Sequence, residues 1–292
     1  MDLLKRDLAP ITTEAWQQID EEARRVLALH LAGRKLVDFS GPHGWGLGCV
    51  NTGRLDQIEK SPVGNVGHAI RVVQPLVELR SPILLPIMEL DYAARGATDL
   101  DLDNVVATAE RVAHAEDSAI WHGFAAGRIE GIIPASPHRP IDVGSPRDWP
   151  RAIAMAKEVL RIAGINGPYA LAAGIESYDE LTAFGDDGYP IRKRIEENLI
   201  DAPVVWAPAL RGGAVLLSTR GGDYELTVGQ DLSVGYTGAG RDNVELYITE
   251  SFTFRVLEDK AAIFLRRGPA RPAPAAPSKA TRTRGGKRDR TP

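Results

Sequence analysis

The feature that most constrains the fold is a long excursion at about residues 50–80, which is rich in β-forming residues yet lacks an apolar run of core length. It follows the turn-rich segment "SGPHGWGLGC" at 40–49. A β-forming stretch without enough apolar surface of its own cannot be stable in isolation. We therefore interpret it as an arm that needs a partner surface.

The rest of the chain has the composition of a globular protein. Its 292 residues, 43% hydrophobic and 25% charged, suffice for one large domain or two modest ones. The single cysteine, Cys49, excludes an intrachain disulfide and a thiolate metal cluster. No apolar run reaches the length of a membrane span, and the N-terminus lacks the apolar region of a signal peptide. We expect a cytoplasmic protein.

Charge is unevenly distributed along the chain. The last 25 residues, 268–292, hold seven Lys or Arg against one acid, whereas the other 267 residues hold 28 bases against 38 acids. The same 25 residues contain five prolines and no large apolar side chain. Such a segment cannot offset the entropy of ordering, so we expect a disordered basic tail on an acidic body.

Helical periodicity marks the first two thirds of the chain. We expect a helix at about 13–32, capped by Thr12 and ended by Gly33. A second is expected within 98–124, with Asp101 or Asp103 as its cap and an apolar stripe of Val106, Ala113, Ile120 and Phe124. A third is expected at about 149–163, and 176–199 indicates helix, acidic loop and helix.

Strands dominate the remainder. A strand is expected at 168–174, and after residue 200 come only strand-like segments, ending in "VELYITESFTFRVLE" with its alternating Leu246, Ile248, Phe252 and Phe254. Helices mixed with strands and followed by a strand-rich end predict an α+β fold rather than a regular βαβ alternation.

No constellation of residues carries a clear chemistry. The "GWGLGC" run lacks the Lys-Ser/Thr of a phosphate loop, and His114, Glu116, Asp117 and His122 lack metal-ligand spacing, so we expect Glu116 and Asp117 to pair with an arginine or a neighbouring chain. The motifs around Asp223 and Asp231 favour turns. No nucleophile elbow is present. The residues alone thus favour a structural or assembly protein over an enzyme, with no catalytic residue and no metal site.

A set of separated motifs resembles the encapsulin shell proteins. They are "LKRDLAPIT", "GRKLVDFSGP", "PLVELR", "EDSAIWHG", "GPYAL", "RGGDYELTVGQDLSVGY" and "YITESFTF", in the family's order, over about residues 1–267. The resemblance implies a tailed-phage major capsid fold of Hong Kong 97 type, assembled as sixty copies or a multiple into an icosahedral shell that encloses a cargo enzyme. That cargo would be a dye-decolourising peroxidase or a ferritin-like iron-storage protein.

The same resemblance implies a division of the chain. The expected parts are an N-terminal helix and connector on the lumen side (1–49), an extended loop (50–80), a peripheral domain with a spine helix at 101–127 (81–135), an axial domain (136–222), a return to the peripheral domain (223–267) and the tail (268–292).

The resemblance also implies three sites. A pocket for the cargo's C-terminal targeting peptide maps onto Arg34, Leu36, Asp38, Leu232 and Val234. A five-fold pore loop that would attract small cations maps onto Phe184, Gly185, Asp186, Asp187, Gly188 and Tyr189. Some members bind a flavin, for which Arg80 matches, but Met88 replaces the expected aromatic residue and argues against a flavin here.

Other interpretations remain open at this stage. A phage capsid protein would share the fold, and a protease or flavin enzyme would be a different class altogether. The basic tail would face outward and could bind nucleic acid or another anionic surface, or serve only solubility.

Overall fold

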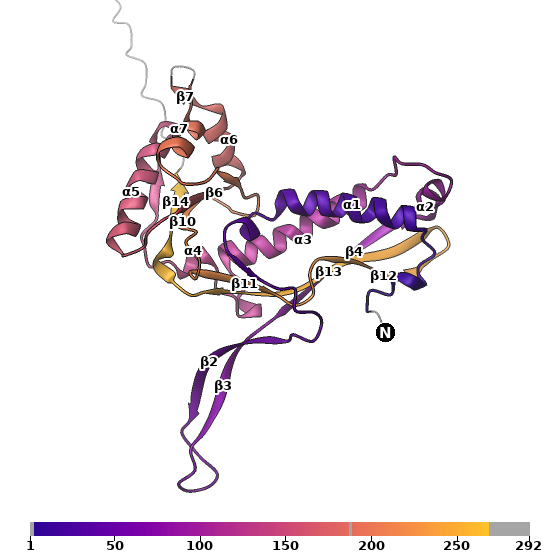
Figure 1. Ribbon diagram of the computed structural model, residues 1–292, viewed down its shortest axis with the longest axis horizontal. Coiled ribbons are helices and arrows are strands. Elements are labelled where there is room, and N and C mark those ends of the chain that lie inside the picture. The colour runs from indigo at the N-terminus through magenta and orange to yellow at the C-terminus, as the bar shows by residue number, and fades with distance from the viewer. Residues whose placement is uncertain (1–2, 187–188, 269–292) are drawn as a thin grey trace, which may run out of the picture.

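A long helix and a long strand form the central part of one half of the molecule (Figure 1). The computed structural model describes residues 3–186 and 189–268. Helix α3 spans Asp103–His122, with the Asp101 carboxylate accepting the Asp103 N–H at its start and Gly123 following its end. Strand β13, Asn243–Val256, runs beneath it. The two elements fix the long axis of this half.

The first sheet is built on β13. One edge of β13 pairs antiparallel with β4 along its length, and the other edge pairs first with β12 and then with β11, which in turn pairs with β1. The bounds of these strands are β1 Asp38–Ser40, β4 Val77–Pro86, β11 Tyr224–Val228 and β12 Ser233–Ala239. The two shorter strands β12 and β11 thus pair with successive parts of the same edge of β13.

Two more helices complete this half. Helix α1, Thr13–His30, begins where the Thr12 hydroxyl accepts the Ala15 N–H, and α2 spans Ile87–Ala94. α1 packs its buried face, which includes Ile19 and Val26, against α3. The prediction that Gly33 ends this helix is wrong, because the C-cap is Leu31 and Gly33 begins a short 3-10 turn.

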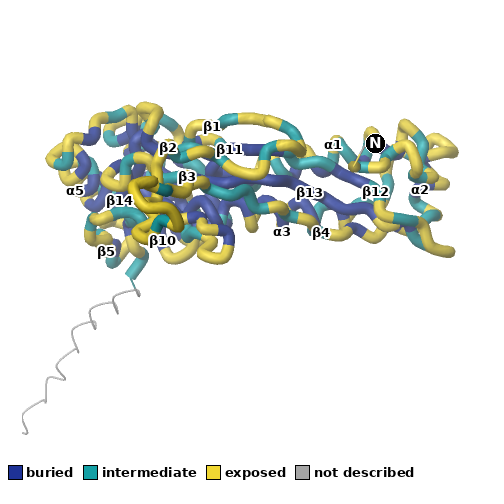
Figure 2. Tube along the Cα trace, turned by 90° about the horizontal axis from the view of Figure 1, so that it is seen from below, coloured by how far each residue is buried: buried dark blue, intermediate teal, exposed yellow. Residues whose placement is uncertain are grey.

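The arm is a two-stranded hairpin that projects from the body (Figure 1). β2, Cys49–Ile58, pairs antiparallel with β3, His68–Pro75, and neither strand pairs with another sheet. Figure 2, seen from below, shows the tip of the hairpin as exposed. The segment therefore has the form that the sequence predicted, an extended excursion without a core of its own.

The second half is a mixed sheet covered by helices. Its strand order is β5, β14, β10, β6, β9, and the central β10 and β6 are buried throughout. The bounds are β5 Ile141–Val143, β6 Tyr169–Ala173, β9 Val205–Trp206, β10 Gly213–Ser218, β14 Ala262–Arg267, α4 Ile132–Ala135, α5 Trp149–Ile162, α6 Ile175–Ala183 and α7 Ile191–Asn198. A small hairpin, β7 Gly185–Asp186 and β8 Tyr189–Pro190, stands at the end of this half (Figure 1).

Short 3-10 turns join several of these elements, at Arg6–Leu8, Gly33–Lys35, Ala125–Gly127, Pro146–Asp148 and Asp259–Ala261. No helix in the described ranges is long and apolar enough to cross a membrane.

The path of the last strand differs from the expectation. The segment 223–267 was predicted to stay with the peripheral half, but β14 leaves it and pairs with β10 and β5 of the second sheet. The reason is burial, since Ile263 and Leu265 lie in the core of that sheet together with Val215. Phe124 is likewise 43% exposed and not part of the buried stripe of α3. The α+β class itself is confirmed.

Candidate functional site

Arg34 lies at the centre of a partly buried group of charges, which we call the ion cluster: Arg34, Glu116, Asp231 and Glu250. The guanidinium donates to Glu116 with Nη2–Oε2 at 2.6 Å and to Asp231 with Nη1–Oδ1 at 2.9 Å, and it also contacts Glu250. Burial opposes the charge of Arg34, but the three carboxylates, Glu116 foremost, raise its pKa above the usual range. The cluster joins α3, β13 and the start of β12.

Two carboxyl groups near this arginine are perturbed by burial. Burial and then the charge of Glu116 raise the pKa of Glu250, and its Oε2 has no hydrogen-bond partner among the described residues. Asp117 accepts the N–H groups of Ala32 and Gly33 at 2.9 and 3.0 Å, while burial and Glu116 raise its pKa to about 7. A Cβ at residue 33 would lie 2.6 Å from Ile120, so glycine permits this close approach.

The expected pairing of Glu116 with an arginine is confirmed, and Asp117 is satisfied by backbone N–H groups instead. Glu250 was missed, although the sequence held a signal for it. In the alternating segment "VELYITESFTF" it lies on the same inward side as Ile248 and Phe252. An acid at such a position requires a buried partner. The turn interpretation of Asp223 fits its structure, because it pairs with Arg220 across a turn containing Gly221 and Gly222, both at positive φ.

A cleft of about 210 Å³ lies between α1, the N-terminal segment and β12. Its lining is Leu4, Arg6, Asp20, Ala23, Arg24, Leu27, Leu232, Ser233, Val234 and Ile248. Ala23 and Val234 are buried at its base, whereas Leu27 and Leu232 are half-buried at its sides. The cleft thus offers an apolar floor that remains reachable from solvent.

Charged side chains border this cleft. Arg6 forms a two-fold hydrogen bond with Asp20 at 2.7 and 3.1 Å and lies 4.0 Å from the centre of the Trp16 ring. Arg24 is exposed and forms no salt bridge with a carboxylate in the described part of the chain. The segment before Arg6 is held in place because the carbonyl groups of Leu3 and Leu4 accept from Tyr247 and Tyr236. One cation at the rim is therefore available to a ligand.

The structure brings only two of the five predicted pocket residues together. Leu232 and Val234 line the cleft. Leu36 is buried in the hydrophobic core, Asp38 on β1 accepts the Gly222 N–H, and Arg34 belongs to the ion cluster. Arg34 still supports the cleft, because its partner Asp231 directly precedes Leu232. The role of all five residues in cargo binding stays a prediction.

Of the predicted pore loop, Gly185 and Asp186 form β7 and Tyr189 begins β8. Phe184 and Tyr189 are about half exposed there, and the Tyr189 hydroxyl donates to Glu197 at 2.6 Å. A Cβ at Gly185 would lie 2.7 Å from the Tyr189 carbonyl oxygen, which explains a glycine in this tight hairpin. Asp187 and Gly188, and the tail after residue 268, lie outside the described residues.

The residues considered for a flavin are Arg80 and Met88, and the argument against a flavin stays a prediction. The Arg80 guanidinium lies 3.6 Å from the centre of the Tyr247 ring, and Met88 is 61% exposed at the start of α2. Met88 has no ring to stack on a flavin. We derive no chemistry from a flavin here.

Comparison with known proteins then decides the family. The model of a family described as "Encapsulating protein for peroxidase" matches residues 1–253. The chain belongs to this family. A type 1 encapsulin shell protein of Rhodospirillum rubrum is 45% identical over 273 residues, which cover 91% of this chain and 97% of that protein. One from Mycobacterium tuberculosis is 40% identical over 266 residues, covering 91% and 99%.

Solved structures agree on the fold of this encapsulin. A virus-like particle from Pyrococcus furiosus aligns with a TM-score of 0.61 at 12% identity, covering 87% of this chain and 100% of that one. The structure titled "Mycobacterium phage Bobi" aligns with a TM-score of 0.54 at 13% identity, covering 82% and 91%. The fold is the tailed-phage capsid fold, and the chain is a shell subunit rather than an enzyme.

Proposed function

We propose that this encapsulin subunit assembles in the cytoplasm, as sixty copies or a multiple, into a closed icosahedral shell around a cargo enzyme. The projecting hairpin supports this assembly, because its strands expose Ile58 and Ile70 without covering them. The family description, which names peroxidase, supports a peroxidase cargo. A ferritin-like iron-storage protein is the second candidate.

We assign the cargo's C-terminal targeting peptide to the cleft between α1 and β12. The observation that carries this assignment is an apolar floor with half-buried walls and, at the rim, Arg24, which pairs with no carboxylate of the described residues. An extended peptide can place apolar side chains on such a floor while its acidic groups or terminal carboxylate meet the arginine. Many equivalent clefts in one shell raise the effective concentration of the peptide.

The test replaces the walls of the cleft. The subunit is co-expressed with a dye-decolourising peroxidase of the same genome, either intact or without its C-terminal peptide, and haem absorbance per purified shell is measured. Leu27→Glu combined with Leu232→Glu is expected to reduce loading more than about tenfold, because burying each leucine is worth about 1.5–3 kcal/mol. Both side chains are half-buried, so the subunit is expected to stay folded.

Leu29→Glu is the matched control. Leu29 lies on the same helix, is 52% exposed and does not line the cleft. It is expected to load like the wild type. Intact shells of the Leu27 and Leu232 variant with unchanged loading would refute the assignment, and so would equal loading of the truncated peroxidase.

We further propose that copies of the β7–β8 hairpin surround a pore for small cations. Asp186 ends β7 and Asp187 follows it in the sequence, and symmetry would multiply their charge. In loaded shells, Asp186→Asn with Asp187→Asn should slow the entry of Fe²⁺ measured by stopped flow, whereas entry of an uncharged dye should stay unchanged. Equal Fe²⁺ entry rates would contradict the pore.

A further inference from the structure

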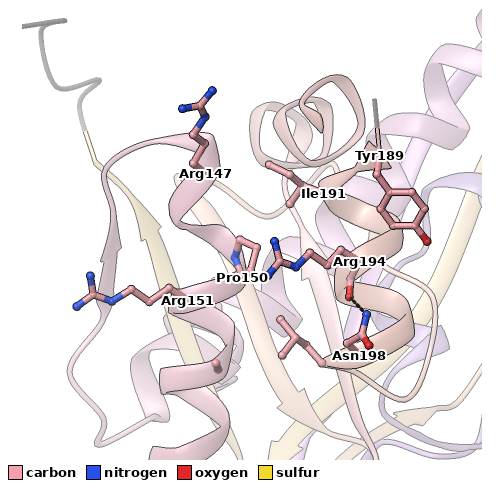
Figure 3. A pocket seen from close by; sticks show the side chains of 9 residues that line it. Arg147, Pro150, Arg151, Tyr189, Ile191, Arg194 and Asn198 are labelled. Carbon is pink, nitrogen blue, oxygen red and sulfur yellow. Dashed lines mark hydrogen bonds between the residues drawn. The ribbon is translucent and has the colours of Figure 1, made fainter. Parts of the chain in front are cut away.

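A second hollow, of about 750 Å³, lies between α5 and α7 in the second half of the molecule (Figure 3). Its apolar lining includes Pro150 and Ile191, and its rim carries the arginines Arg147, Arg151 and Arg194. It is separate from the cleft at α1. Tyr189 of the predicted pore loop also lines it, and no other residue of the sites considered above does.

Two of these arginines carry uncompensated charge. Arg151 and Arg194 are exposed, and neither forms a salt bridge with a carboxylate in residues 3–186 or 189–268. Other arginines of the same two helices do pair, since Arg161 contacts Glu158 at 2.5 Å and Arg192 contacts Glu196 at 3.6 Å. Arg151 and Arg194 thus place two positive charges without a described carboxylate partner at the hollow.

The opposite flank of this half is acidic. α7 packs against both α5 and α6, and Figure 1 draws α5 and α6 on opposite sides of α7. α6 carries Glu176, Asp179 and Glu180 and no basic residue. Glu180 faces inward, because its side chain is 16% exposed and accepts both from Arg267 and from the Trp149 indole of α5. Glu176 also contacts Arg267, but its side chain is 73% exposed. Asp179 is exposed and pairs with no base in the described part of the chain.

We propose that the basic hollow of one subunit receives the acidic α6 flank of the next copy around the axis at the β7–β8 hairpin. This inference rests on the proposed shell. Different surfaces on opposite flanks form a head-to-tail contact, which closes into a ring when its rotation closes. Opposite charges on the two flanks then select the neighbour and fix its register.

The arrangement of the arginines favours a second copy over a small anion. In Figure 3 Arg194 extends from α7 across the hollow towards Pro150, whereas Arg147 and Arg151 extend outward from the other wall. A small anion such as phosphate needs donors that converge on one point. Outward-directed guanidinium groups above an apolar floor instead match a broad surface that carries separated carboxylates.

Charge reversal tests the contact in the full-length chain. Arg151→Glu with Arg194→Glu, and separately Glu176→Arg with Asp179→Arg, should each lower the fraction of subunits in shells at least about tenfold at low salt, because like charges then face each other. Combining all four substitutions should restore assembly. Assembly is measured by light scattering and electron microscopy, and circular dichroism of the unassembled subunits checks that each variant is folded.

The matched control is Arg161→Glu with Lys193→Glu, which makes the same charge change on the same two helices but outside the hollow. It should assemble like the wild type. If the wild type forms no shell, the proposed function fails first. If the wild type forms shells and either flank variant assembles equally well, or the fourfold variant is not restored, the contact is refuted. Phosphate binding lost in the arginine variant with assembly unchanged would identify an anion site instead.

Discussion

Arg34 holds carboxylates from three separate parts of the chain, and two of them, Glu116 and Glu250, have no exposed side-chain surface. Burying an ion pair does not by itself stabilise a protein, but removing one partner leaves a charge without compensation. Arg34→Met is therefore expected to lower the free energy of unfolding by about 3–5 kcal/mol, measured by urea unfolding of the subunit.

A compensated variant makes this prediction specific. Arg34→Met together with Glu116→Gln and Glu250→Gln should recover part of the loss, because no uncompensated charge then remains in the cluster. If Arg34→Met unfolds like the wild type and its shells lose cargo, Arg34 acts directly on the cargo and not through the fold.

Two buried carboxyl groups, Glu250 of the ion cluster and the neighbouring Asp117, predict that the free energy of unfolding falls as the pH rises. Burial and Glu116 raise the pKa of Glu250 and raise that of Asp117 to about 7. The folded state therefore holds these protons more tightly than the unfolded state. The contribution of Asp117 is full below the ordinary carboxyl pKa of about 4 and is lost as the pH rises through about 7. The contribution of Glu250 is likewise lost as the pH rises through its raised pKa.

Glu250→Gln imitates the protonated form and should weaken this dependence. The unfolding free energy that is lost as the pH rises should be smaller than in the wild type. Glu245→Gln, on an exposed position of the same strand, is the control and should change nothing. Parallel pH profiles for the wild type and Glu250→Gln would refute the prediction.

At the level of elements, the β2–β3 hairpin exposes apolar side chains that only a neighbouring subunit could cover. On one face of the hairpin lie Ile58, Ile70 and Val72, with exposed fractions of 43%, 60% and 38%. Ile58→Asp with Ile70→Asp should leave the melting temperature of the unassembled subunit unchanged but reduce shell yield more than about tenfold, because each isoleucine loses about 1.5–3 kcal/mol of burial. Native gel electrophoresis measures the yield.

Gln57→Asp with Ala69→Asp provides the control for the arm. These residues face each other on the other side of the same hairpin and gain the same charge without losing a large apolar group. Their effect on yield should be smaller. Equal yields for all three proteins would show that the arm's apolar face is not buried on assembly.

Helices with a strong apolar periodicity could be predicted from the sequence. Strand pairings between segments far apart in the sequence could not. Helical spacing placed α1 and α5 to within two residues, and the Thr12 cap placed the start of α1, because these signals are local. No local signal shows that β14 crosses to the second sheet. For the candidate site, Leu232 and Val234 followed from the family resemblance, whereas Arg24 and the basic hollow arise only when separate helices pack together.

On the scale of the whole molecule, the fold and the family indicate that subunits assemble into a shell. The charge of the shell surface then determines which charged ligands it binds. The body of 267 residues has ten more acids than bases, whereas residues 268–292 have six more bases than acids. A shell would repeat that contrast in every subunit. The last described residue, Gly268, donates its N–H to Val143 on the second sheet, so the tail begins at the edge strand of that sheet.

If the tails face outward, the shell should bind duplex DNA through its phosphates. Binding of this kind releases counterions, so the logarithm of the binding constant should fall with the logarithm of salt concentration by about 0.9 for each phosphate contacted. Gel shifts of assembled shells with DNA, from about 0.02 to 0.2 M salt, measure the slope. Deleting 268–292, or replacing its seven basic residues with glutamine, should abolish the shift without altering assembly. Since the remaining surface is acidic overall, a shift that survives the deletion, or none at the lowest salt, would exclude the tail as an anion-binding element.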